Sequence, residues 1–118
     1  MTTIDFVNYQ KNLEELKFIR QITHNYSKGI ELVNKHLDAI NRIMGSSEIE
    51  NIENDIKASY NTHKAYFLYK EGKILQANEC FQSAVKSNST DYHIYYDWAE
   101  MCEEVVLTIK GDEENETV

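Results

Sequence analysis

The residues whose side chains could do chemistry are scattered along this chain. No two of its four histidines stand at the i, i+3 or i+4 spacing that would place them on one helix face as metal ligands. These histidines are His24, His36, His63 and His93. No HExxH or CxxC motif occurs, and Gly72 stands alone rather than in a glycine-rich phosphate loop. The sequence therefore predicts neither a metal site nor a cofactor site.

The reactive side chains are expected to have packing roles. His63 falls on the inner apolar stripe of a predicted helix, which favours a satisfied core residue over a ligand. Cys80 and Cys102 are expected to be free, buried thiols in a reducing compartment. Paired carboxylates are expected on solvated helix faces, since nothing gathers them in a pocket. No catalytic residue is predicted, and we expect that the chain is not an enzyme; the alternative of an α-helical enzyme rests only on these unpaired His and Cys side chains.

Composition narrows the class of partner. The formal charge of −8 argues against nucleic-acid binding, because phosphate neutralisation needs clustered Lys and Arg. No run approaches the ~20 apolar residues that cross a bilayer, and the first ten residues, MTTIDFVNYQ, lack the basic start and apolar core of a secretory signal. We expect an intracellular soluble protein with protein partners, without membrane contact and without a small-molecule substrate. The terminal GDEENETV carries four acids and no base, which predicts an acidic disordered tail over 111–118.

Five helices joined by short polar links are expected within one domain over residues 1–110. Apolar residues recur at helical spacing in five segments, and no period-2 stretch of any length occurs. The chain has no proline, so its few glycines become the candidate helix stops. The predicted helices run from about 4 to 22, 27 to 45, 47 to 70, 73 to 87 and 91 to 111. The predicted fold class is all-α.

Capping residues define the helix ends. Ser27, Ser47 and Asp91 are the expected N-caps of the second, third and fifth helices. Gly45 and Gly72 are the expected stops of the second and third helices. The third helix would be roughly 23 residues long, so a break around residues 54–59 is the alternative.

A small–large–small pattern predicts how the third and fourth helices pack. Ala77, Phe81 and Ala84 share one helix face, and Ala65 offers a close approach on the partner helix. Ala99 lies 34 residues after Ala65, which is the period of tetratricopeptide repeats. A similar spacing recurs 48 residues upstream rather than 34. We therefore expect antiparallel hairpins stacked as an irregular, tetratricopeptide-like α-solenoid segment.

The fifth helix is predicted to carry a partner-binding surface. Its expected inward residues are Tyr95, Trp98, Ala99, Cys102, Val105, Val106 and Ile109. Tyr92 and Tyr96 would stay half-exposed because no further helix covers them, and exposed aromatic residues often mark a contact site. The simpler interpretation is that they have no role. Asn61, Lys64 and Asn78 are the first candidates for holding a peptide between helix pairs.

The segment HKAYFLYKEGKILQANECFQSAVKSNSTDYHIYYDWAEMCEE resembles part of the FAT region of phosphatidylinositol-3-kinase-related kinases. Its closest likeness is to the transformation/transcription-domain-associated pseudokinase branch, and it spans roughly residues 13–104. The likeness is carried by Gly29 to Asn34, Ala77-Asn78, Phe81, Ala84-Val85 and Trp98. The resemblance implies a non-catalytic scaffold in nuclear histone-acetyltransferase assemblies such as SAGA, where the family receives transcriptional activators. The alternative is a free-standing tetratricopeptide-like adaptor that binds a peptide or a partner helix.

Overall fold

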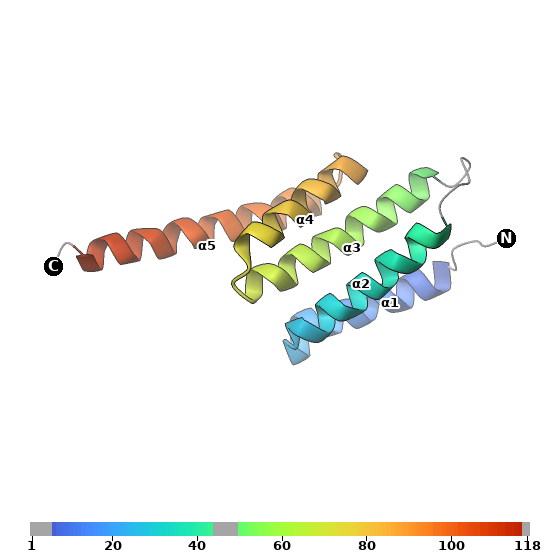
Figure 1. Ribbon diagram of the computed structural model, residues 1–118, viewed down its shortest axis with the longest axis horizontal. Helices are drawn as coiled ribbons and strands as arrows, with labels where there is room; N and C mark the ends of the chain where they lie inside the picture. The colour runs from blue at the N-terminus through green and yellow to red at the C-terminus, as the bar shows by residue number, and fades with distance from the viewer. Residues whose placement is uncertain (1–5, 44–49, 117–118) are drawn as a thin grey trace.

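Helix α3 is the centre of the fold. The computed structural model describes residues 6–43 and 50–116. Its elements are α1 (Phe6–Phe18), the π-helical turn η1 (Ile19–Thr23), α2 (Tyr26–Ile43), α3 (Glu50–Lys70), α4 (Ile74–Ser87) and α5 (Tyr92–Glu116). α3 packs between α2 and α4, and α5 lies across α3 and α4 (Figure 1). The described residues form helices and no strand, so the all-α prediction is confirmed. The tetratricopeptide-like arrangement stays a prediction.

Gly72 ends α3, as predicted. Its φ of +83° lies in the left-handed region that glycine adopts without steric cost. The Gly72 N–H donates to the carbonyl of Tyr69 at 2.9 Å, and the Lys73 N–H donates to the carbonyl of Leu68 at 2.9 Å. These paired bonds are those of a Schellman motif, and they turn the chain back into α4.

One of the three predicted N-caps is confirmed and one is wrong. Asp91 caps α5, because its Oδ1 accepts a hydrogen bond from a backbone N–H of the first turn at 3.0 Å. Asn25 caps α2 instead of Ser27: its Oδ1 accepts from the Lys28 N–H at 3.3 Å. The helix can begin this early because His24 is left-handed, with φ of 56°, and ends η1 just before it. The predicted Ser47 cap lies outside the described residues, as does the Gly45 stop.

Two of the longer helices are continuous. α3 runs unbroken from Glu50 to Lys70, which excludes the alternative of a break around residues 54–59. α5 passes through Gly111 to Glu116, so the predicted helix end at Gly111 is wrong. One glycine costs a helix interior only about 1 kcal/mol, and no proline follows it. The division at residue 111 into a domain and an acidic tail is a separate claim, and it stays a prediction.

Small side chains let α3 and α4 approach closely, as predicted. Ala65, Ala77 and Ala84 are fully buried, and so is Phe81 between them. The Phe81 ring stacks on the indole of Trp98, with centroids 5.6 Å apart and an interplanar angle of 13°, so it also joins α4 to α5. A second apolar cluster fills the space between α1, α2 and α3. Its buried members are Leu16, Ile19, Val33, Ile40, Ile56, Tyr60 and Phe67.

The inward face of α5 differs from the prediction. Its buried residues are Ile94, Asp97 and Met101. Of the predicted inward set, Trp98 and Val105 are half-buried, whereas Tyr95, Ala99, Cys102, Val106 and Ile109 are exposed. The buried residues and the predicted inward residues both recur at helical spacing along α5, so each set forms a row on one face. The neighbouring helices decide which of the two rows turns inward. The expectation of a buried thiol is therefore wrong for Cys102 and holds only in part for the half-buried Cys80; both cysteines are free.

Candidate functional site: a polar cleft between α1 and α5

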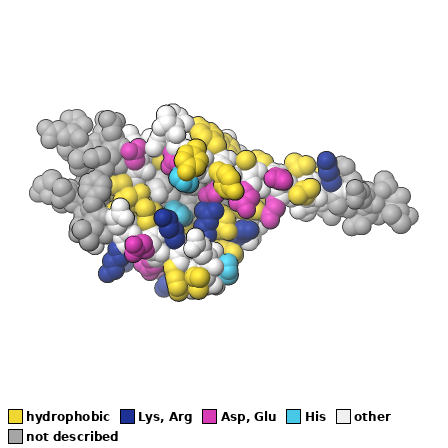
Figure 2. Space-filling model, turned by 180° about the vertical axis from the view of Figure 1, so that it is seen from behind, with side chains coloured by type: hydrophobic (Ala, Val, Ile, Leu, Met, Phe, Trp, Pro, Cys, Tyr) yellow, Lys and Arg dark blue, Asp and Glu magenta, His cyan; other side chains and the backbone are white. Residues whose placement is uncertain are grey.

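A polar cleft lies between α1 with η1 on one side and the start of α5 on the other, and α3 forms its floor. Its volume of about 460 Å³ falls within the roughly 300–1,000 Å³ of small-ligand pockets. Its lining residues are Leu13, Lys17, Arg20, Gln21, Ser59, Thr62, His63, Asp91, His93, Tyr96 and Asp97. Figure 2 looks at the side of the molecule opposite to Figure 1 and shows basic, acidic and histidine side chains gathered near its middle.

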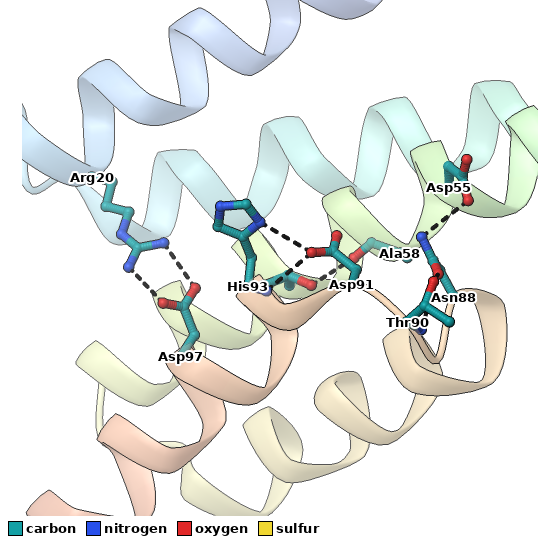
Figure 3. A network of polar contacts seen from close by, with 9 residues as sticks. Arg20, Asp55, Ala58, Asn88, Thr90, Asp91, His93 and Asp97 are labelled. Carbon is teal, nitrogen blue, oxygen red and sulfur yellow. Dashed lines mark hydrogen bonds and ion pairs between the residues drawn. The ribbon is translucent and has the colours of Figure 1, made fainter.

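An ion pair between Arg20 and Asp97 joins the two walls of the cleft. The guanidinium donates two parallel hydrogen bonds, Nη1 to Oδ2 and Nη2 to Oδ1, each 2.9 Å long (Figure 3). Its carbon also lies 3.7 Å from the ring centroid of Tyr66 on α3. Burial by itself lowers the pKa of Arg20, but the hydrogen bonds and charge of Asp97 outweigh it, so the net pKa is raised. This bidentate pair fixes η1 to α5 across 77 residues of sequence.

His63 occupies the floor of the cleft. Its side chain is 9% exposed, and its Nδ1 has no hydrogen-bond partner within the part of the chain that the structure describes. Burial, together with the charges of Arg20 and Lys17, lowers the pKa of His63 to about 4, and Asp97 offsets this only in part. The imidazole is therefore neutral at pH 7. The prediction of a buried histidine is confirmed, but the prediction that it is satisfied is wrong, because its buried Nδ1 has no hydrogen-bond partner among the described residues.

Polar and aromatic side chains from the start of α5 form the opposite wall. The Nδ1 of His93 lies 3.0 Å from Oδ1 of Asp91 (Figure 3), and the His93 ring stacks on Tyr92 with centroids 4.1 Å apart. Tyr96 lines the cleft and is 71% exposed. Tyr92 is 70% exposed and adjoins the cleft through His93. Of the two predicted tyrosines, the structure thus places Tyr96 in the cleft lining and Tyr92 beside it, and their role in partner binding stays a prediction.

The other three predicted site residues lie away from the cleft lining. Asn61 and Lys64 are half-buried on α3, and neither lines the cleft. Asn78 on α4 accepts a hydrogen bond from the indole Nε1 of Trp98 at 2.9 Å, so its carbonyl oxygen already joins α4 to α5. The structure does not bring these three residues together with Tyr92 and Tyr96 in one pocket. Their proposed role in holding a peptide stays a prediction.

The charged residues of the cleft were not predicted from the sequence. Lys17, Arg20 and Asp97 received no role there, because the residues of the cleft come from three helices that are distant in sequence. One signal was present. Asp97 falls between Ile94 and Met101 on a helical stripe, and a buried acid on such a stripe needs a cationic partner.

The cleft can offer hydrogen-bond donors and a neutral imidazole to a ligand. In residues 6–43 and 50–116, no three His, Cys, Asp or Glu side chains lie close enough together to hold a metal ion. None of the helices in those ranges has both the length and the apolarity needed to cross a bilayer.

Comparison with known proteins assigns no family. No family model matches the chain, and neither a curated protein nor a solved structure matches it. The resemblance to the FAT region therefore stays a hypothesis from the sequence.

Proposed function

We propose that this chain is a non-catalytic helical scaffold that binds protein partners. The main support comes from the second half of α5, which extends beyond the other helices (Figure 1). Val106, Leu107 and Ile109 on this segment are 49%, 59% and 52% exposed. A lone helix gains little stability in water unless an apolar face is covered. A partner surface that covers these side chains would supply that stability.

The expected partner has an apolar helix face flanked by basic residues. Glu103 and Glu104 precede the exposed aliphatic residues, and the acid-rich GDEENETV follows them. Opposite charges on the partner would fix its orientation and speed association.

A narrower proposal is membership in a nuclear histone-acetyltransferase coactivator assembly. It is supported only by the resemblance of residues 13–104 to the FAT region of the pseudokinase subunit. Under this proposal the chain would act as a helical surface that other subunits contact.

Site-specific crosslinking tests both levels of the proposal. A photoreactive amino acid at Leu107 should capture a discrete partner in cells, whereas the same amino acid at the exposed Gln82 of α4 should not. Acetyltransferase subunits among the products at Leu107 would support the narrower proposal, and other proteins would contradict it. The same products at both positions, or none at Leu107, would contradict the role of α5.

A second candidate function is that of a free-standing adaptor that binds a peptide. The specific observation in its favour is the polar cleft of about 460 Å³, which side chains from α1, η1, α3 and α5 line. A peptide in this cleft would contact polar side chains from α1, η1 and α5.

A further inference from the structure

We propose that the exposed face of α5 binds a partner helix in the way that α3 binds α4: antiparallel, with one large aromatic side chain between two small ones. This inference rests on the scaffold function proposed above and narrows its partner to a helix with this pattern. It extends the contact surface from the aliphatic end of α5 to the whole length of the helix.

One face of α5 repeats the burial of α3 at an offset of 34 residues. On α3 this face consists of Tyr60, His63 and Phe67, which are buried. The residues 34 positions later are buried as well, and they are Ile94, Asp97 and Met101. Each helix therefore turns the same positions toward helices that precede it in the chain.

A second face is covered on α3 but exposed on α5. Ala58, Ala65 and Leu68 of α3 are buried in one apolar cluster with the inner face of α4. The residues 34 positions later are all exposed, and they are Tyr92, Ala99 and Cys102. Among the described residues, α5 therefore has no counterpart of the helix that covers α3.

The exposed row on α5 keeps helical spacing over its full length. Its members lie alternately three and four residues apart, and they are Tyr92, Tyr95, Ala99, Cys102, Val106 and Ile109. All six are exposed. Steps of three and four are those at which one helix meets another along its length. Because α5 also buries its other row, it is apolar on two sides, which is typical of a helix that is covered on both.

The sizes of the side chains in the row indicate the shape of the partner. Ala99 lies near the middle of the row, and Tyr92 and Tyr95 lie on its N-terminal side. A large partner side chain would fill the space over Ala99, as the buried Phe81 of α4 does in the cluster that holds Ala65. Small partner residues would leave room for the two tyrosines. The expected partner helix therefore has the small–large–small pattern of α4.

Charge and helix polarity favour an antiparallel partner. α5 ends in the acid-rich residues 112–116. In an antiparallel pair the partner helix begins at this end, and the N-terminus of a helix carries a partial positive charge that acidic residues stabilise. Glu103 is exposed next to the row, so a basic residue on the partner would find an opposite charge there.

Two synthetic helical peptides test this proposal with the full chain. The first has Phe with Ala four residues before it and Ala three residues after it, and Lys on both sides of this face. The second has Ala in place of the Phe. In fluorescence anisotropy the Phe peptide should bind about tenfold more tightly, because the Ala peptide leaves the space over Ala99 empty.

A substitution at the centre of the row tests the fit from the protein side. Ala99→Leu should weaken binding of the Phe peptide by about tenfold, because two large side chains would then compete for one space. It should also remove the preference for the Phe peptide over the Ala peptide. Ala39→Leu is the matched control, since Ala39 is exposed on α2 and lies outside the row.

The exposed thiol of Cys102 reports the orientation of the bound peptide. With glutathione disulfide as the oxidant, a Cys placed four residues before the Phe should form a disulfide with Cys102, whereas a Cys three residues after the Phe should not. The reverse result would show parallel pairing and would overturn the antiparallel arrangement. Cys102→Ser identifies the reacting thiol, because Cys80 is also free.

The other outcomes separate this inference from the scaffold function. Equal binding of both peptides to the wild type and to Ala99→Leu would overturn the inference but leave the scaffold function standing. Binding of neither peptide would also overturn it, and crosslinking from Leu107 would then decide the scaffold function independently. If analytical ultracentrifugation of the protein alone shows a dimer that Ala99→Leu dissociates and Ala39→Leu does not, a second copy of this chain covers α5 and the proposal is wrong.

Discussion

The contact between Gly29 and Phe67 allows a sharp prediction about how α2 packs on α3. Gly29 is buried in α2, and a Cβ atom placed there would lie 2.7, 2.8 and 2.9 Å from three carbons of the Phe67 ring. Such distances are too short for carbon contacts, so either the ring or the helix would have to move. The ring is 0% exposed and lies among the rings of Tyr26, His63 and Tyr66, which leaves it little room.

Two opposing effects determine the result of Gly29→Ala. Alanine is favoured over glycine in a helix by about 0.8–1.0 kcal/mol. Overpacking a close-packed core costs about 1–3 kcal/mol. Because the clash involves ring atoms in the core rather than the end of a flexible side chain, we expect the steric cost to dominate. Gly29→Ala should therefore lower the free energy of unfolding by about 1–2 kcal/mol.

Urea denaturation followed by far-UV circular dichroism measures this change. Asn34→Ala is the control for helix propensity, since Asn34 is exposed on the same helix, and it should stabilise by about 0.5 kcal/mol. Adding Phe67→Leu to Gly29→Ala should relieve the clash and give a favourable coupling in a double-mutant cycle. If Gly29→Ala stabilised the protein as Asn34→Ala does, the Phe67 ring would not lie against Gly29 and the packing of α2 on α3 would be wrong.

Three further perturbations test the core, the cleft floor and the ion pair. Phe81→Ala should cost about 3–5 kcal/mol in urea denaturation because it leaves a cavity between α3 and α4, and an unchanged midpoint would contradict that pairing. The free energy of unfolding should fall by about 2 kcal/mol between pH 7.5 and pH 5, because the unfolded state protonates His63 near pH 6.5 and the folded state only near pH 4. His36, whose pKa burial also lowers, adds to the loss in the same direction, so a flat profile over this window would show that His63 is not buried. Asp97→Asn should destabilise by about 1.5–3 kcal/mol, and an equal effect in an Arg20→Met background would show that the two residues are not coupled.

Features that depend on neighbours along the chain were predictable from the sequence. Helical periodicity identified all five helices, and the left-handed Gly72 and the capping carboxylate of Asp91 set two of the helix ends. The spacing of Ala77, Phe81 and Ala84 identified the face of α4 that packs on α3. These features follow from backbone geometry and side-chain size within about one or two turns, so a single sequence contains the required information.

Other features depend on residues far apart in the chain, and the tertiary structure alone decided them. α5 has two rows of helical periodicity, and the neighbouring helices turned the row with Ile94 and Met101 inward, where Asp97 pairs with Arg20. The same juxtaposition of η1 and α5 over α3 creates the cleft, with His63 at its floor. Helical periodicity specifies a face of one helix, but it does not specify which distant helix meets that face. The site therefore became visible only once the helices were placed side by side.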